Sequence, residues 1–434
     1  MAHGARFKSR NGGWTRGRRF GHTVRPAHDH GAGCGKCLFQ ATLQIKLAQS
    51  RCHGQRNGCY PTPGRMVRLV WTCAAIDHGV TVFPNGKIGP CCQISADYLK
   101  PISELANPDR FADLKTHDCY TGHPCNKCSV NEYHGLPSYR NVFDSAVTSA
   151  PGLQFVDIRN NNLCNLKCRY CVPHFSSQWA EELNVSPLIQ HQDLADYKNT
   201  LITDSLHWMY FTGGEPLISS DHWNLLEELI DTNRSSSISL MYNTNLTTIK
   251  YKDKNIIDIW RQFKSVKIQC SIDAVGQPLE YIRSGTSWEK IKSNIDQLMS
   301  ALQNSNINVN FSPVLSILNI WFIDTLYDYA SLNNIPVDLI ILSGPDYLAL
   351  DVIPDQLKTL ALDKINQLEA QYKIDNNTLL RIKNLINNNT NQQLFQQTVS
   401  HVLLLDNLRQ EKLFDLLPFK SLAVDTILRN YEYE

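Results

Sequence analysis

Three cysteines within eight residues place the strongest constraint on this chain. Cys164, Cys168 and Cys171 follow one another at spacings of four and three, just after a strand-like run at residues 153–158. A thiolate needs a partner that compensates its deprotonation, so three in one loop indicate a shared metal centre rather than packing. A closed zinc site or an ordinary ferredoxin cluster takes four protein ligands. Three ligands would leave one iron of a four-iron cluster open to a group that is not protein. The alternative is a zinc loop with a fourth ligand elsewhere.

The spacing Cys-x3-Cys-x2-Cys, with Tyr170 just before the last cysteine, resembles the signature of the radical SAM enzymes. The resemblance implies a 4Fe-4S cluster on these cysteines, with S-adenosylmethionine chelating the open iron through its amino and carboxylate groups. It also implies that the reduced cluster splits S-adenosylmethionine to a 5'-deoxyadenosyl radical, with the electron coming from a donor such as flavodoxin or ferredoxin.

Composition places the chain among ordinary globular proteins of the cytoplasm. Hydrophobic residues make up 42% and charged residues 19% of the 434 residues. No apolar run approaches the 18 or more residues that would span a bilayer, so we expect no membrane association. Of the 14 cysteines, only Cys270 lies beyond residue 171, and the others form short-spaced groups. Metal-bound thiolates in a reducing cytosol fit that distribution better than secretion does.

The first 66 residues differ from the rest of the chain. Residues 1–70 hold 13 Lys and Arg against one acid, a net charge of +12, which leaves −11 for the remainder. We expect a disordered basic arm, or an upstream stretch included by a misplaced start codon. A basic tail could touch nucleic acid, yet no motif supports such a partner and we do not expect one. The cysteines of this arm are weak evidence for zinc: Cys34, Cys37, Cys52 and Cys59.

A second group of cysteines lies in a region that we place at residues 67–150. Residues 81–83 are strand-like, and Asn85-Gly86 predicts a type I' hairpin turn. Cysteines bracket this hairpin and a Cys-x2-Cys pair follows it, which resembles the SPASM or shorter twitch extension of radical SAM enzymes. The resemblance implies an auxiliary 4Fe-4S cluster closed by four thiolates: Cys73, Cys91, Cys125 and Cys128.

That region departs from the family pattern in two respects. The extension usually follows the catalytic barrel, whereas here it precedes it, which puts its placement over the active site in doubt. Cys92 and Cys119 are left over, so either could replace an assigned ligand. A structural zinc hairpin is the alternative. If the site is closed, its roles are electron transfer and structure.

Strand-like and helical segments alternate regularly over residues 151–350. Amphipathic helical stretches at 223–230, 288–302 and 321–332 separate strand-like runs. Six such units predict an α/β fold with a parallel sheet, an open (β/α)6 relative of the TIM barrel, with chemistry at the carboxyl ends of the strands. Residues 351–434 predict a helical extension, with helices at 355–372 and 394–417. The strand-like runs are 153–158, 207–211, 237–244, 266–272, 309–314 and 337–342.

The second predicted strand ends at Gly213-Gly214-Glu215-Pro216. Two glycines let the backbone approach a ligand closely, and Pro216 biases Glu215 toward an extended conformation that would present its carbonyl and carboxylate outward. This turn resembles the Gly-Gly-Glu-Pro sequence that binds the methionyl amine in radical SAM enzymes.

The next predicted strands also end in polar residues. Asn243 and Asn245 share one face by the two-residue period, as do Gln269, Ser271 and Asp273. They resemble the strand ends that line the cofactor and substrate space in SPASM-type enzymes. Arg283 resembles the arginine that pairs with the methionine carboxylate, for which a guanidinium fork is a suitable donor.

The sequence as a whole predicts a radical SAM enzyme, with a peptide or protein as the first guess for its substrate and small-molecule or nucleotide-derived substrates left open. No acid or base that would finish the reaction is identified, although Asp273 and Tyr242 are candidates. Two other classes remain open: a zinc-binding, nucleic-acid-interacting module, and a silent barrel that binds S-adenosylmethionine without cleaving it.

Overall fold

The structure is a computed structural model that describes residues 73–116, 125–133, 138–186, 192–303 and 305–417. All of them belong to one compact unit, residues 33–434. The basic arm at residues 1–66, with Cys34, Cys37, Cys52 and Cys59, lies outside the described residues, as does Cys119.

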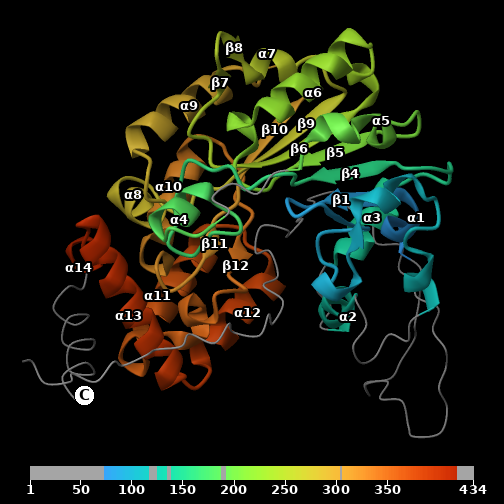
Figure 1. Cartoon of the computed structure of the whole chain (residues 1–434). Coiled ribbons are helices and arrows are strands. Elements are labelled where there is room, and N and C mark those ends of the chain that lie inside the picture. Colours follow the sequence, from blue (N-terminus) through green and yellow to red (C-terminus); the bar gives the residue numbers. More distant parts are fainter. Residues whose placement is uncertain (1–72, 117–124, 134–137, 187–191, 304, 418–434) are drawn as a thin grey trace, which may run out of the picture. The chain divides into compact units, whose positions relative to one another are not determined.

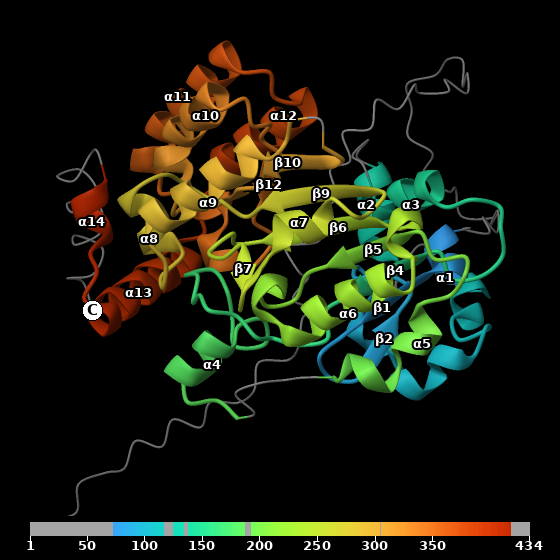
Figure 2. The same ribbon diagram turned by 90° about the horizontal axis from the view of Figure 1, so that it is seen from above.

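The described residues form a main sheet of eight strands in the order β10-β9-β6-β5-β4-β1-β2-β3 (Figures 1 and 2). The run from β10 to β1 is parallel throughout. A predominantly parallel sheet with helical crossovers confirms the predicted fold class. The strands are β1 (Gly79–Val82), β2 (Lys87–Gly89), β3 (Lys100–Pro101), β4 (Phe155–Ile158), β5 (Trp208–Phe211), β6 (Ser239–Thr244), β9 (Ser265–Cys270) and β10 (Ile307–Phe311).

The two faces of the sheet carry different side chains. Alternate residues such as Val156, Met209 and Leu240 are fully buried in the main hydrophobic cluster, where they pack with the crossover helices. Residues of opposite parity, including Asp157, Tyr210 and Asn243, form the other face, which we call the inner face. Because successive side chains of a strand point to opposite faces, one strand can serve both the core and a polar site.

The crossover helices are amphipathic and bury one face against the sheet. In α9 (Trp288–Ser300), Ile291, Ile295 and Leu298 are buried at helical spacing. Figure 1 shows α6 and α7 on one side of the sheet and α1 and α3 on the other. The helices before the carboxyl-terminal extension are α1 (Ala74–His78), α2 (Asn126–Tyr133), α3 (Tyr139–Ala146), α4 (Ser177–Glu182), α5 (Lys198–Leu201), α6 (Ser220–Asp231), α7 (Ile256–Trp260), α8 (Gln277–Ile282), α9 and α10 (Ile323–Leu332).

The predicted hairpin forms, but its turn differs from the prediction. Only Gly86 has a positive φ, of 72°, whereas a type I' turn needs two such residues. Pro84 fixes its own φ near −65°, which begins an ordinary turn and leaves the left-handed position to Gly86. The hairpin is also continuous with the main sheet, because β1 pairs in parallel with β4.

Strand β10 ends at Phe311, two residues before Pro313, and next to it the sheet continues only as an isolated parallel bridge between Phe311 and Val337. Proline has no N–H for the ladder, and the predicted run 309–314 is split into β10 and β11 (Val314–Leu315). β11 pairs with β12 (Ile340–Ile341) in a separate two-stranded sheet, so the barrel is open, as predicted. A further short hairpin joins β7 (Lys250–Tyr251) to β8 (Lys254–Asn255).

The described part of the carboxyl-terminal extension is helical, with four α-helices where two were predicted. The predicted helix at 355–372 is α11 (Asp355–Gln371), and the predicted segment 394–417 divides into α13 (Gln392–Arg409) and α14 (Leu413–Leu416). The added helix, α12 (Asn376–Asn387), is capped by Asp375, which accepts a hydrogen bond from the Thr378 backbone N–H at 2.8 Å. In the described part of the chain, no helix has both the length and the apolar character needed to cross a membrane.

Candidate functional site

The three cysteines lie in a loop, residues 163–171, which we call the cluster loop. It follows β4 at the carboxyl edge of the parallel strands, where ligand sites of such folds are found. Backbone hydrogen bonds hold it from one side: the N–H groups of Lys167 and Arg169 donate to the carbonyls of Ser284 and Ile282 at 3.0 and 2.8 Å. The loop is therefore positioned by the end of α8 and the residues just after it, more than 100 residues further along the chain.

The amino-terminal end of α4 holds the other side of the loop. The Ser176 hydroxyl donates to the Leu166 carbonyl at 2.6 Å, and the Cys164 backbone N–H donates to the Ser177 hydroxyl at 3.2 Å. Trp179 Nε1 donates to the Cys168 carbonyl at 2.8 Å. With both sides fixed, the loop can present its thiols in one arrangement.

The donor set fits a four-iron cluster. All three cysteines are thiols rather than members of disulfides, with Cys164 and Cys168 buried and Cys171 partly exposed. Arg283 Nη1 lies 3.7 Å from Cys168 Sγ, and a guanidinium is a suitable donor to a thiolate. Among the described residues, no three His, Cys, Asp or Glu side chains converge as a single metal ion requires. Thiolates that each bind a different iron of a cluster need not converge in that way.

The glycines at residues 213 and 214 allow the turn to pack against the cluster loop. Gly213 has φ +103°, and a Cβ on Gly214 would lie 2.0 Å from the Leu163 carbonyl oxygen. The Glu215 N–H donates to that same oxygen at 2.7 Å. We call residues 212–216 the Gly-Gly-Glu turn. The close approach that the glycines permit is thus made to the loop that carries the cysteines.

Glu215 is extended, as Pro216 predicts, with φ −131° and ψ 111°. The expectation that its carboxylate points outward is wrong, because the side chain is buried and turns toward the end of β6. Oε1 accepts from the Thr244 hydroxyl at 2.7 Å and Oε2 from the Asn245 backbone N–H at 2.6 Å. The carboxylate therefore fixes the neighbouring strand end, while its backbone stays beside the cluster loop.

The two predicted asparagines serve different contacts. The Tyr210 hydroxyl donates to Asn243 Oδ1 at 2.9 Å on the inner face. Asn245 Nδ2 donates to Asn165 Oδ1 of the cluster loop at 3.1 Å, and Thr247 donates to Asn245 Oδ1. Asn245 thereby joins the end of β6 directly to the loop.

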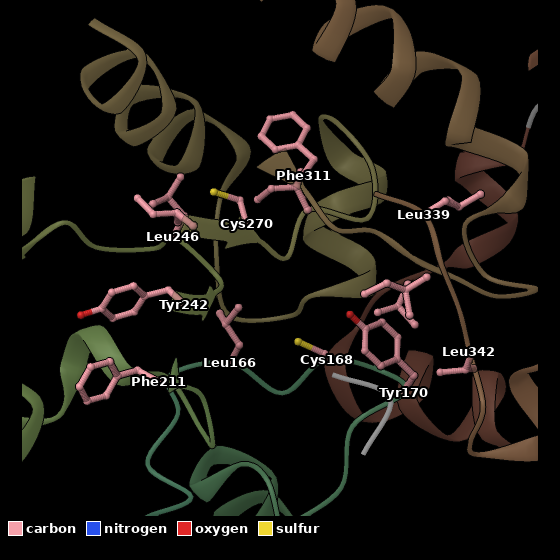
Figure 3. Packing of buried hydrophobic residues seen from close by; sticks show 14 of the residues in the cluster. Leu166, Cys168, Tyr170, Phe211, Tyr242, Leu246, Cys270, Phe311, Leu339 and Leu342 are labelled. Carbon is pink, nitrogen blue, oxygen red and sulfur yellow. The ribbon is translucent and has the colours of Figure 1, made fainter. Parts of the chain in front are cut away.

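Asp273 and Arg283 form a buried ion pair beside Tyr170. Arg283 Nε lies 2.8 Å from Asp273 Oδ2, and the Tyr170 hydroxyl donates to the same oxygen at 2.5 Å. Burial lowers the pKa of Arg283, but Asp273, Tyr170 and Cys168 together outweigh it, so the pKa rises overall. Burial raises the pKa of Tyr170. Figure 3 shows Tyr170 and Cys168 next to one another on the cluster loop.

One guanidinium nitrogen of Arg283 remains available to a ligand. Its Nη2 is buried and has no hydrogen-bond partner among the described residues. A buried, unmatched guanidinium N–H is costly unless something accepts from it, and a carboxylate such as that of S-adenosylmethionine suits it. The residues present thus fit the predicted cofactor. Ser271 is buried nearby, and its backbone N–H donates to the Thr244 carbonyl at 2.8 Å.

Tyr242, a candidate acid or base, is excluded by its position. Its side chain lies on the apolar face among the helices, where its hydroxyl and His222 Nε2 share a hydrogen bond of 2.8 Å. Burial raises the pKa of Tyr242 and lowers that of His222 to about 3. Neither group faces the cluster loop across the inner face.

The cysteines of the amino-terminal hairpin gather in a second place. A small hydrophobic cluster contains Cys91, Cys92 and Cys128, with Cys73 packed against it. Burial, together with the nearby Cys125 and Cys128, raises the pKa of Cys73 to about 12. Burial raises the pKa of Cys91 too, as do Cys92, Cys128 and Cys73. The four predicted ligands and Cys92 are therefore close neighbours.

The surroundings of these sulfurs include donors for thiolates. Backbone N–H groups of Arg140 and Tyr139, at the start of α3, hydrogen-bond Cys128, and that of Ala75 hydrogen-bonds Cys73. Hydrogen bonds to sulfur are one of the means by which proteins tune iron-sulfur clusters.

One contributor was missed from the sequence: α13 of the carboxyl-terminal extension. Its Asp406 lies 2.7 Å from Nη2 of Arg169 in the cluster loop, and His401 Nε2 shares a hydrogen bond of 2.8 Å with the Arg169 carbonyl. Glu411, beyond the helix, lies 2.5 Å from the same guanidinium nitrogen. No motif marks these residues, which are more than 230 positions from Arg169 in sequence.

Comparisons with known proteins identify the class. Residues 161–330 match the family model of the Radical SAM superfamily. The predicted class, a radical SAM enzyme, is thereby confirmed.

GTP 3',8-cyclase of Campylobacter lari is 24% identical over 163 residues, which cover 37% of this chain and 47% of that protein. 7-carboxy-7-deazaguanine synthase of Thermoplasma acidophilum is 24% identical over 130 residues, 29% of this chain and 57% of that protein. The chain spans about half the length of these curated relatives.

Solved structures give fainter likenesses. "Native anSMEcpe with bound AdoMet" has a TM-score of 0.35 at 16% identity and covers 50% of this chain and 59% of that one. The methyltransferase TsrM from Kitasatospora setae has a TM-score of 0.32 at 13% identity, with 43% and 35% covered. Such scores carry no argument about substrate or site.

Proposed function

We propose that this chain binds a 4Fe-4S cluster through Cys164, Cys168 and Cys171, binds S-adenosylmethionine beside it, and acts on a peptide or protein. When bound and reduced by one electron, these cofactors would supply a 5'-deoxyadenosyl radical for hydrogen abstraction. The observation that carries the proposal is the hydrogen bond of 2.7 Å between the Glu215 N–H and the Leu163 carbonyl. It joins the two most specific motifs of the chain, far apart in sequence, at one edge of the sheet.

The chain's own residues would bind and orient the cofactor. Arg283 Nη2 would donate to the methionine carboxylate, and Asp273 and Tyr170 hold that guanidinium in place. Backbone carbonyls of the Gly-Gly-Glu turn would accept from the methionyl amine, with Gly213 and Gly214 close enough to the cluster loop to do so. The polar side chains of this site are largely buried, which would exclude water from the reaction. Asn243, Asn245 and Ser271 remain predicted contacts.

Formation of 5'-deoxyadenosine tests the proposal. The full chain, purified without oxygen and reconstituted with iron and sulfide, is incubated with S-adenosylmethionine and dithionite. We expect 5'-deoxyadenosine that depends on both iron and dithionite. Equimolar zinc without sulfide would instead support the zinc module, and bound S-adenosylmethionine without cleavage would support the silent barrel. Flavodoxin or ferredoxin is the electron donor we propose in place of dithionite.

An auxiliary 4Fe-4S cluster on Cys73, Cys91, Cys125 and Cys128 is part of the proposal. It is supported by the crowding of these thiols: burial raises the pKa of Cys73, Cys91 and Cys128, and neighbouring cysteines contribute to each rise. Metal binding would remove the electrostatic cost of several neighbouring thiolates, because a coordinating thiol is deprotonated outright and its charge is compensated by the metal. Cys92 lies in the same group and is the alternative ligand.

Iron content should report this second cluster. With two four-iron clusters we expect about eight iron per chain, and about four in Cys91→Ala. Cys92→Ala should keep about eight iron per chain. If Cys92 rather than Cys91 is the ligand, then Cys92→Ala should hold about four iron and Cys91→Ala about eight. Cys270→Ala is the matched control, since that thiol is buried in the main core away from the group. Unchanged iron in both Cys91→Ala and Cys92→Ala would refute the auxiliary cluster.

The peptide substrate rests on the resemblance of the hairpin cysteines to the SPASM and twitch extensions. The curated relatives favour a second candidate, since the name GTP 3',8-cyclase specifies a nucleotide substrate for those proteins. The main chain of a peptide is uncharged, whereas a nucleoside triphosphate is strongly negative. The charges of the side chains near the cofactor site therefore help to distinguish the two candidates.

A further inference from the structure

Polar side chains from five consecutive parallel strands lie at one level of the inner face. Asn243 pairs with Gln269 across β6 and β9, and Gln269 pairs with Asn310 across β9 and β10. Thr212 and Arg159 stand one residue past the last pairs of β5 and β4. We call these five residues the polar belt. Because Thr212 begins the Gly-Gly-Glu turn and Gln269 is two residues before Ser271, the belt adjoins the proposed cofactor site.

Only some of the polar atoms of the belt have hydrogen-bond partners among the described residues. Asn243 accepts from Tyr210, and Asn310 Nδ2 donates to Asp338 Oδ2 at 2.7 Å. Gln269 Nε2 and the Thr212 hydroxyl, in side chains 2% and 7% exposed, have no hydrogen-bond partner among the described residues. Native interiors rarely leave such groups unmatched, so two unmatched atoms at one level indicate a ligand that supplies the missing partners.

Charge limits what that ligand can be. Arg159 is held by Asp157, with Nε at 2.9 Å from Oδ1 and Nη2 at 2.8 Å from Oδ2. Lys267, one pair below Gln269 on the same face, is matched by Asp338, which opposes the lowering of its pKa by burial. The inner face therefore has no surplus positive charge from these groups. A triphosphate is recognised by unpaired Arg and Lys, whereas amides and hydroxyls suit neutral polar groups.

We propose that the polar belt binds main-chain amide and carbonyl groups of a peptide substrate, which Gln269 and Thr212 contact directly. This inference rests on the proposed function and specifies its substrate class. Side-chain amides both donate and accept hydrogen bonds. They can therefore donate to a peptide carbonyl or accept from a peptide N–H. The belt would hold an extended segment beside the cofactor without using charge.

Binding of two probes by the full, reconstituted chain tests the belt. One probe is an uncharged pentapeptide blocked at both ends, and the other is GTP. Saturation-transfer NMR in the presence of S-adenosylmethionine measures the dissociation constant of each. For Gln269→Met and for Thr212→Val, each close in size to the residue it replaces, we expect the peptide to bind about three- to tenfold more weakly. Asn308→Ala, which removes an exposed amide from β10, is the matched control and should bind like the wild type.

Two outcomes would overturn the belt: GTP binding that weakens in Gln269→Met and Thr212→Val, or peptide binding that is absent or changes in neither variant. Far-UV circular dichroism and iron content identify a variant that fails to fold, and the second variant then decides. The proposed function is tested separately by 5'-deoxyadenosine from the wild type in the same preparation. If the wild type makes no 5'-deoxyadenosine, the proposed enzyme function is refuted. If peptide binding is the same in the wild type and both variants, only the role of the polar belt is refuted.

Discussion

Gly214→Ala should lower 5'-deoxyadenosine formation by about 100-fold or more and reduce iron loading. The added Cβ would lie 2.0 Å from the Leu163 carbonyl oxygen and 2.5 Å from its carbon. Both atoms belong to the backbone, so no side-chain rotation can relieve the overlap. The cluster loop would have to retreat by more than about 1 Å, and misplacement on that scale costs about 100-fold in positioned reactions.

Gly344→Ala is the matched control for this prediction. A Cβ on Gly344 meets no atom within 4 Å, and its φ is not positive. We expect wild-type iron content and wild-type 5'-deoxyadenosine formation from this variant. If Gly214→Ala also behaves like the wild type, then the packing of the Gly-Gly-Glu turn on the cluster loop is not what holds the site together.

Local patterns in the sequence predicted much of the fold and the centre of the site. The cysteine trio is contiguous, so its position after β4 follows from the strand that precedes it. Gly213 and Gly214 could be recognised because a turn after a strand restricts the residues it accepts. The open barrel followed from the alternation of helical and extended periods, and the family match confirms that class.

Contacts between distant residues could not be predicted in this way. Glu215 turns inward because Thr244 and Asn245 lie on the next strand and offer two donors to its carboxylate. The hairpin joins the main sheet because β1 pairs with β4, a pairing about 75 residues apart that no local pattern specifies. Both outcomes depend on which strands become neighbours, which is a property of the folded chain.

The carboxyl-terminal extension makes the most distant of these contacts, through Arg169. Its guanidinium is fully buried, stacks on the Tyr281 ring at 3.5 Å from the centroid, and donates from Nε to the Tyr281 carbonyl at 3.0 Å. Asp406 and Glu411 pair with its Nη2. Asp406 also accepts from the Tyr281 hydroxyl at 2.8 Å. Arg169 thus joins α13 to the cluster loop between its second and third cysteines.

Arg169→Met should destabilise the protein by about 3–5 kcal/mol, because it removes one side of a buried ion pair and leaves Asp406 without its cation. Urea unfolding of the reconstituted chain measures this free energy, and iron content measures the effect on the cluster loop. Arg261→Met is the control, since Arg261 and Asp258 form an exposed pair for which surface ion pairs predict a change below about 1 kcal/mol. Adding Asp406→Leu to Arg169→Met should restore part of the loss, because the unpaired carboxylate is removed as well. Equal unfolding free energies for Arg169→Met and Arg261→Met would mean that the carboxyl-terminal extension does not support the loop.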